Sequence, residues 1–83
     1  MNVIVYSHER CVACRVLKEF LADRGVEYVL KNLQADPSAR QEFRERGFLL
    51  PPVTVIDGEV VMGFDPFRLE ELLDRGQVAG GSP

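Results

Sequence analysis

The only two cysteines of the chain, Cys11 and Cys14, are separated by two residues. An apolar run, Asn2–Tyr6, precedes them, and apolar residues recur at helical spacing over residues 16–21. This pattern predicts a strand, a short turn and a helix that begins at or near Cys11. Residues three apart on a helix share one face, with about 5–6 Å between Cβ atoms, so a disulfide between them opens or closes with little backbone movement. The pair is therefore suited to thiol–disulfide exchange.

Cys11 is the better candidate for the attacking thiol of this pair. At a helix start it lies among unsatisfied backbone N–H groups, at the positive end of the helix dipole. Such positions lower a thiol pKa from about 8.5 into the range of roughly 3.5–7.5. Arg10 and Arg15 flank the motif, and their positive charges also favour the thiolate. Cys14, one turn into the helix, should be more buried and should keep a higher pKa.

Two other interpretations of the cysteine pair carry less weight. Inert buried thiols are expected inside a core, whereas Cys11 falls at the start of a helix. A structural zinc site needs about four ligands. Only His8 is nearby, and the chain has no second CxxC motif. We therefore expect no bound metal.

Composition is typical of one small globular domain. The length of 83 residues is near the size at which a single core is only just sufficient. A net charge of −3 leaves no basic stripe for nucleic acid. No apolar run approaches the roughly 20 residues that span a membrane, and a strand from Asn2 leaves no room for a signal peptide. We expect a cytoplasmic protein, in which a CxxC pair is more often catalytic or metal-binding than structural.

The elements that must position the pair follow from local signals. Asp36-Pro37 and Asp65-Pro66 each place a capping acceptor before a proline at the first helical position, and Asp57-Gly58 is a two-residue hairpin signal. The predicted elements are strands over 2–6, 26–30, 53–56 and 59–62, and helices over 11–24, from 37 to Gly47, and from 66 to Gly76. This βαβαββα order predicts an α/β fold with a four-stranded mixed sheet flanked by helices. The domain is expected to cover residues 1–76, with a flexible tail over 77–83.

Four segments, in order along the chain, resemble the glutaredoxins and the glutaredoxin-like NrdH-redoxins of the thioredoxin superfamily. They are Tyr6-Ser7, Cys11-Val12-Ala13-Cys14, Pro52-Val53-Thr54-Val55-Ile56-Asp57-Gly58 and Gly63-Phe64-Asp65-Pro66. The resemblance covers roughly residues 2–75 and implies a minimal thioredoxin-like fold. It also implies that the peptide bond before Pro52 is cis and that Pro52 faces the active-site cysteine.

Particular positions separate the two groups. Glutathione-dependent glutaredoxins usually have Pro-Tyr between the cysteines and a lysine three residues before the first one, where this chain has Val12-Ala13 and His8. NrdH-redoxins usually have a Gly-Phe-x-Pro turn, as in residues 63–66, but also Trp-Ser before it, where this chain has Val61-Met62. Asp65 resembles the acid of the glutaredoxin glutathione site. The comparison favours the NrdH side.

The resemblance also implies a substrate groove beside the cysteines, formed by Pro51, Pro52, Gly63, Phe64 and Asp65. In these folds the residue before the cis-proline usually offers both its N–H and its C=O to a docked substrate. Pro51 occupies that place and can offer only its C=O, because proline has no N–H.

These features predict a dithiol–disulfide oxidoreductase in which Cys11 attacks and Cys14 resolves the mixed disulfide. We expect a monomer with no permanently bound cofactor. Its electrons would come from thioredoxin reductase or from glutathione, and the resemblance implies ribonucleotide reductase as the leading client. Two alternatives stay open: a glutathione-dependent glutaredoxin and, in another class, an iron–sulfur-cluster-carrying or redox-regulated binding module.

Overall fold

The structure is a computed structural model that describes residues 1–81, with side chains through Arg75. Its elements, in order, are β1 (Val3–Ser7), α1 (Val12–Asp23), β2 (Val29–Asn32), α2 (Pro37–Glu45), β3 (Val53–Ile56), β4 (Glu59–Met62) and α3 (Pro66–Gly81). The predicted βαβαββα order is confirmed, and β3 and β4 have the predicted bounds. Helices α1 and α2 end within two residues of their predicted ends.

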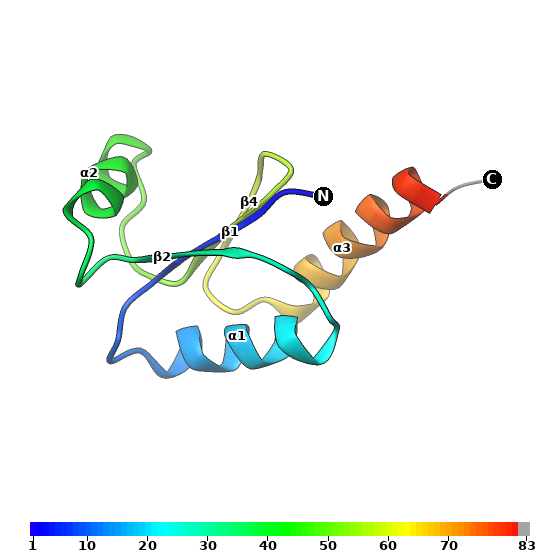
Figure 1. Ribbon diagram of the computed structural model, residues 1–83, viewed down its shortest axis with the longest axis horizontal. Coiled ribbons are helices and arrows are strands. Elements are labelled where there is room, and N and C mark those ends of the chain that lie inside the picture. Colours follow the sequence, from blue (N-terminus) through cyan, green and yellow to red (C-terminus); the bar gives the residue numbers. More distant parts are fainter. Residues whose placement is uncertain (82–83) are drawn as a thin grey trace.

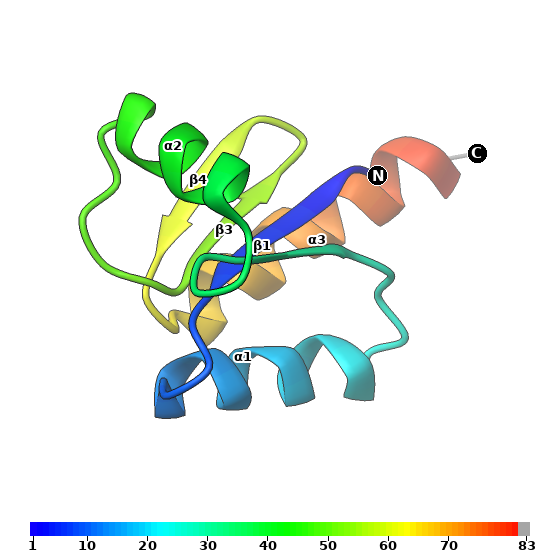
Figure 2. The same ribbon diagram turned by 60° about the vertical axis from the view of Figure 1, so that its left-hand side comes forward.

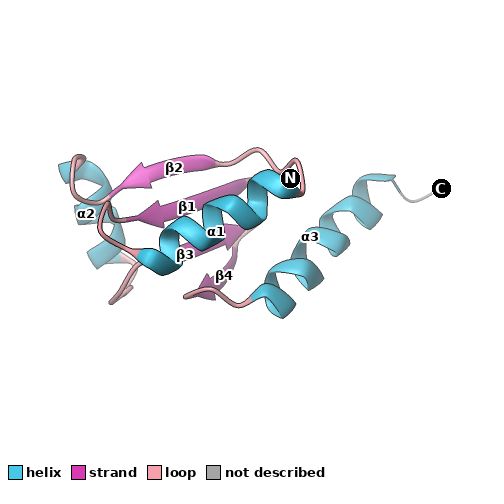
Figure 3. Ribbon diagram, turned by 90° about the horizontal axis from the view of Figure 1, so that it is seen from below, coloured by secondary structure: helices cyan, strands magenta, loops and turns pink. Residues whose placement is uncertain are grey.

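A four-stranded mixed sheet in the order β2-β1-β3-β4 forms the middle layer (Figure 3). β1 and β2 are parallel, because helix α1 carries the chain back between them, while β3 pairs antiparallel with both β1 and β4. Asp57 and Gly58 join β3 to β4 with φ values of 48° and 88°. Two positive φ values are what a tight hairpin turn requires, so the Asp-Gly signal is confirmed.

Helices cover both faces of the sheet, with α1 and α3 on one side and α2 on the other (Figure 1). Side chains alternate between the faces of a strand, so the two central strands, β1 and β3, supply both cores. The core under α1 and α3 comprises Val3, Val5, Leu17, Leu21, Ile56, Val61, Leu69, Leu72 and Leu73. The core under α2 comprises Tyr6, Leu33, Ala39, Phe43, Phe48, Val53 and Val55. Ala39 and Phe43 of α2, and the three leucines of α3, therefore face the sheet.

The second strand was predicted too early in the chain. It covers Val29–Asn32 and not Val26–Leu30, because its extent is set by pairing with β1. The backbone N–H of Val26 donates instead to the carbonyl of Leu21, at 3.0 Å, and so helps to end α1. Local alternation could not reveal that this N–H is used by the preceding helix.

The last helix continues past its predicted end. Helix α3 reaches Gly81, so its predicted end by Gly76 is wrong. Glycine inside a helix costs only about 1 kcal/mol relative to alanine, and Gln77 and Ala79 are good helix formers. The domain boundary at residue 76 and the mobility of residues 77–83 stay predictions, and residues 82–83 lie outside the described part. Among the described helices, none has the length and apolar character needed to cross a membrane.

Candidate active site

Cys11 and Cys14 are joined by a disulfide at the start of α1, with 5.2 Å between their Cα atoms. That Cα separation lies within the usual range for disulfides, so one helical turn accommodates the bond. Cys11 is the N-cap of the helix, with extended backbone, and its Sγ accepts a hydrogen bond from the Cys14 N–H at 3.1 Å. The sulfur that is predicted to attack is therefore also the acceptor that begins the helix.

The two sulfurs differ in accessibility. Cys14 is fully buried, with 0% of its surface exposed, whereas Cys11 is half-buried. The predicted order of burial is confirmed, and it suits Cys11 to meet an external disulfide and Cys14 to resolve it. In the reduced protein the Cys14 N–H would be placed to stabilise a Cys11 thiolate, because a hydrogen bond to the charged form favours that form.

Both flanking arginines line a cleft together with Cys11. Arg10 and Arg15 are exposed and line, together with Cys11, Val12 and Glu9, a cleft of about 300 Å³. Glu9 was not considered in the sequence analysis, and its negative charge opposes that of the arginines. The effect of Arg10 and Arg15 on the thiolate stays a prediction.

The Pro51–Pro52 peptide bond is cis, as the resemblance implied. Pro52 is buried, and its carbonyl accepts a hydrogen bond from the Gly63 N–H at 2.8 Å. This bond joins the start of β3 to the turn between β4 and α3. Tyr6 pairs with Val53, so the end of β1 and the start of β3 lie at the same edge of the sheet as this turn. The chain continues from the end of β1 to Cys11, so the cysteine segment begins at this edge too.

The two residues after Gly63 have clear structural roles. The ring of Phe64 packs edge-on against Phe20 of α1, with 5.5 Å between ring centroids. Asp65 is exposed, and its carboxylate accepts a hydrogen bond from the Arg68 N–H at 3.2 Å, so it caps α3. Contacts of substrate with Pro51, Pro52, Gly63, Phe64 and Asp65 stay predictions.

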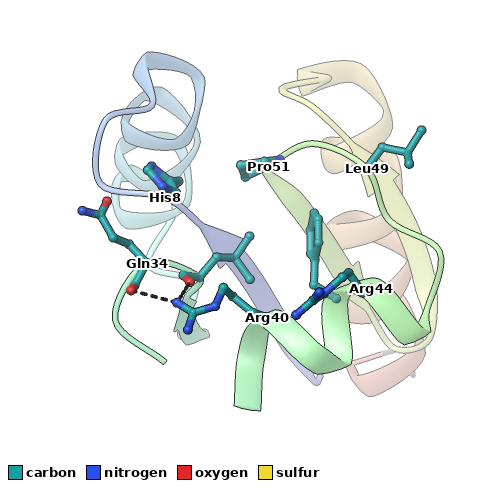
Figure 4. Close-up of a pocket in the computed structure, with 8 residues that line it drawn as sticks. His8, Gln34, Arg40, Arg44, Leu49 and Pro51 are labelled. Atoms are coloured by element: carbon teal, nitrogen blue, oxygen red, sulfur yellow. Dashed lines mark hydrogen bonds between the residues drawn. The ribbon is translucent and has the colours of Figure 1, made fainter. Parts of the chain in front are cut away.

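A second cleft, of about 370 Å³, lies beside the same edge and was missed in the sequence analysis (Figure 4). We call it the α2 cleft; its lining residues are His8, Leu33, Gln34, Arg40, Phe43, Arg44, Leu49 and Pro51. Two arginines one turn apart on a predicted helix were the available signal. That signal is weak, because such residues are usually solvent-exposed surface charges.

No cluster of three or more potential metal-ligating side chains occurs within the described residues. What the site offers is a disulfide with one reachable and one shielded sulfur, on a thioredoxin-like sheet. These features define a thiol–disulfide oxidoreductase.

Comparison with known proteins narrows this class. Residues 3–61 match the family model for glutaredoxin, and the chain therefore belongs to the glutaredoxin family. The glutaredoxin-like protein NrdH of Salmonella typhimurium is 29% identical over 72 residues, which cover 87% of this chain and 89% of that protein. The NrdH protein of Lactococcus lactis subsp. cremoris is 30% identical over 70 residues, which cover 84% of this chain and 97% of that protein.

Solved structures agree with this assignment. The glutaredoxin-like NrdH-redoxin from Escherichia coli superposes with a TM-score of 0.79 and 28% identity, covering 87% of this chain and 95% of that one. The thioredoxin-like protein BC3987 superposes with a TM-score of 0.80 and 35% identity, covering 86% of this chain and 99% of that one. The chain is thus an NrdH-like glutaredoxin-family redox carrier, and its partners are molecules that hold a disulfide or a dithiol.

Proposed function

We propose that this protein takes electrons from a thioredoxin reductase in preference to glutathione and delivers them to a protein disulfide. Ribonucleotide reductase is the leading client. The observation that carries the proposal is the exposure of apolar side chains in the segments that hold the cysteines and the cis-proline: Val12, between the cysteines, is 69% exposed, and Leu50, next to Pro51, is 78% exposed. Exposed apolar side chains of this size suit contact with another protein.

The identity of two positions supports the same choice of electron donor. The aromatic residue and the lysine that glutathione-dependent glutaredoxins usually carry are replaced by Ala13 and His8. The E. coli NrdH-redoxin, similar over most of this chain, has a thioredoxin-like activity profile. Reduction by a flavoprotein of the thioredoxin reductase type needs a protein-docking surface and no glutathione groove.

The reaction is a two-step exchange that moves two electrons. The Cys11 thiolate attacks one sulfur of the substrate disulfide, forms a mixed disulfide and releases the other substrate sulfur as a thiolate, which takes a proton from water. Cys14 then loses its proton and attacks Sγ of Cys11, which releases the second substrate thiolate and leaves the Cys11–Cys14 disulfide. The reductase returns the electrons through the same steps in reverse.

The placement of the pair suits each step. Only Cys11 has surface that a large substrate reaches, while Cys14 is held within one helical turn of it. Resolution is therefore intramolecular and fast compared with attack by a second external thiol. The cycle requires no permanently bound cofactor and a single copy of the chain, and we expect it to operate in the cytoplasm, where reductants maintain dithiols.

The test offers the oxidised protein two complete electron sources in parallel. One is thioredoxin reductase with NADPH, and the other is glutathione with its reductase and NADPH. We expect reduction of the Cys11–Cys14 disulfide to be faster with thioredoxin reductase. Equal or faster turnover with glutathione would instead assign the chain to the glutathione-dependent glutaredoxins. Visible absorbance after anaerobic purification would favour the cluster-carrying alternative.

A further inference from the structure

Thr54 of β3 places a hydroxyl among apolar core side chains. It has 0% of its surface exposed, and within residues 1–75 its Oγ1 has no hydrogen-bond partner. A valine would have nearly the same shape without the polar group, and burying an unpaired hydroxyl costs free energy. Buried polar atoms in folded proteins nearly always have a partner, so this oxygen requires an explanation beyond packing.

The hydroxyl lies on the α1 side of the sheet. Side chains alternate along a strand, and the chain neighbours of Thr54, Val53 and Val55, belong to the core under α2. Across the sheet, Thr54 pairs with Val5 of β1 and Val61 of β4, which both belong to the core under α1 and α3. Residues directly opposite each other on antiparallel strands share a face, so the Thr54 side chain points into the same core.

Cys14 points into that core from the helix above it. Cys14, Leu17 and Leu21 are the buried residues of α1, at helical spacing, and the two leucines belong to the core under α1 and α3. Helix α1 starts at the end of the sheet where β1 ends (Figure 3). Thr54 is the second residue of β3, which begins at that same end. The buried sulfur and the unpartnered hydroxyl therefore face the same end of one core.

The oxidised and reduced proteins differ in what the Cys14 sulfur can accept. In this oxidised structure its Sγ is bonded to Cys11 and makes no hydrogen bond with Thr54. A neutral sulfur is a weak acceptor, whereas a thiolate accepts a strong, charge-assisted hydrogen bond. Reduction also frees the Cys14 side chain to rotate about its Cα–Cβ bond, because the link to Cys11 no longer fixes it.

We propose that Thr54 donates a hydrogen bond to the Cys14 sulfur in the reduced protein and while Cys14 resolves the mixed disulfide. This inference rests on the exchange reaction proposed above. In that step the Cys14 S–H bond breaks, and its sulfur carries negative charge until it bonds to Sγ of Cys11 and the substrate thiolate leaves. The Thr54 O–H bond stays intact, so Thr54 transfers no proton and no electron. Its hydrogen bond offsets the desolvation that opposes a buried thiolate.

The reduction potential is the first measurement. Thr54→Val removes the donor and keeps the shape, so the oxidised protein loses an unpaired hydroxyl and the reduced protein loses a hydrogen bond. Both changes favour the disulfide. We expect the equilibrium constant for reduction by dithiothreitol to fall about three- to tenfold, which lowers the potential by roughly 15–30 mV.

Thr54→Ser is the matched control for that measurement. It keeps the hydroxyl and loses one methyl group, so both redox forms should lose stability to the resulting cavity. Its reduction potential should stay close to that of the unchanged protein, because the donor is still present. Chemical denaturation of the oxidised and reduced forms of each variant measures these stabilities separately.

The acidity of Cys14 is the second measurement, made in the Cys11→Ser variant, where Cys14 is the one remaining thiol. Adding Thr54→Val should raise the pKa of the Cys14 thiol, with an acid dissociation constant about three- to tenfold smaller, since the thiolate loses its donor. Adding Thr54→Ser should leave the pKa nearly unchanged. Ultraviolet absorbance of the thiolate gives the midpoint, and circular dichroism before each titration confirms that the variants are folded.

The outcomes separate this inference from the function on which it rests. An unchanged potential in Thr54→Val would overturn it and would assign the hydroxyl to a water molecule or a carbonyl that it keeps in both redox states. An equal shift in Thr54→Ser would also overturn it, because the methyl group would then be responsible. Dithiothreitol reports on the cysteine pair without any reductase. The expected shifts in a protein that neither thioredoxin reductase nor glutathione reduces would therefore count against the proposed function alone.

Discussion

Cys11 has two roles at the first turn of α1. Its sulfur accepts a hydrogen bond from the Cys14 N–H, which would otherwise lack an intrahelical partner, and Cys11 is also the more exposed cysteine of the pair. Cys14 makes no comparable contact with solvent, since it is fully buried. At the scale of single residues, the difference in exposure on which the proposed division of labour rests therefore follows from where the helix begins.

Replacing each cysteine separately should separate attack from resolution. Cys11→Ser should abolish disulfide reduction, because the remaining thiol is shielded. Cys14→Ser should still attack and should accumulate a mixed disulfide with substrate, visible as an added mass in intact-protein mass spectrometry. The assignment of the nucleophile would be wrong if Cys14→Ser reacted no faster with an alkylating agent than Cys11→Ser.

The acidity of Cys11 can be measured in the Cys14→Ser variant. The pKa of the Cys11 thiol should lie clearly below the roughly 8.5 of a free thiol. Three features should lower it: its place at the helix start, the backbone N–H of residue 14, and the charges of Arg10 and Arg15. Ultraviolet absorbance of the thiolate followed against pH gives the midpoint. Arg10→Gln and Arg15→Gln should each raise it, and a midpoint at or above the free-thiol value would contradict the prediction.

Pro51 lies half-buried on the rim of the α2 cleft and has no N–H to offer a docked substrate. Pro51→Val restores that donor, and one backbone hydrogen bond contributes roughly 0.5–1.5 kcal/mol net, or about three- to tenfold in affinity. The variant should form a more stable mixed disulfide between Cys11 and glutathione. The measurement is the equilibrium constant for forming this mixed disulfide in both proteins. The control is the free energy of unfolding, which should change by less than about 1 kcal/mol. An equal or smaller equilibrium constant would show that the missing N–H does not limit binding.

At the scale of elements, helix α2 is attached to the sheet by a partly buried polar contact as well as by its apolar side chains. The Tyr6 hydroxyl donates to Glu42, and Lys31 donates to both oxygens of the same carboxylate, at 2.8 and 3.1 Å. The hydrogen bond from Lys31, followed by that from Tyr6, lowers the pKa of Glu42 below its usual value. Burial, together with the bond to Glu42, raises the pKa of Tyr6 to about 12.

This contact should make the stability of the protein depend on pH through Glu42. A carboxyl whose folded-state pKa is lowered contributes stability that is present above the unfolded value, about 4.3, and is lost as the pH falls through the folded value. Glu42→Gln should cost about 1 kcal/mol at pH 7, since the ion pair is partly exposed, and the difference from the unchanged protein should shrink below about pH 4.

Chemical denaturation at several pH values measures this dependence. Glu45→Gln is the matched control on the same helix, because Glu45 is exposed and, among residues 1–75, is hydrogen-bonded through its side chain only to Gln41, at 3.4 Å. A pH-independent cost of Glu42→Gln would contradict the assigned role of its charge.

At the scale of the whole molecule, two separate cores stabilise a small domain, and the helix that carries the disulfide packs on one of them. Helix α1, which presents the disulfide, shares its core with α3 through Leu17, Leu21 and Leu69, all with 0% of their surface exposed. The C-terminal helix thus contributes to the position of an active site at the other end of the chain (Figure 2).

Truncating Leu69 should therefore weaken the entire fold. Leu69→Ala removes a fully buried side chain and should cost about 2–5 kcal/mol, a large fraction of the roughly 4–12 kcal/mol expected for a domain of this length. Thermal unfolding of the oxidised protein measures the loss. Phe67→Ala, on the same helix with 85% of Phe67 exposed, should change stability by less than about 0.5 kcal/mol. A similar loss in both variants would argue against a specific role for the α1–α3 core.

What the amino-acid sequence by itself determined about this protein was local in origin. Two cysteines at helical spacing, the cap-and-proline starts at Asp36 and Asp65, and the Asp57-Gly58 turn each depend on a few neighbouring residues, so the order of elements and the redox pair were predictable. The cis bond before Pro52 was predictable only through the family resemblance, because the local sequence favours trans.

Tertiary structure alone decided the features that need residues distant in the chain. The start of β2 depends on where β1 lies, and the full burial of Cys14 depends on what packs over α1. The α2 cleft requires His8, Arg44 and Pro51 from three separate segments to meet at one edge of the sheet. Such a meeting follows from strand pairing and packing of the whole chain, and no local pattern specifies it.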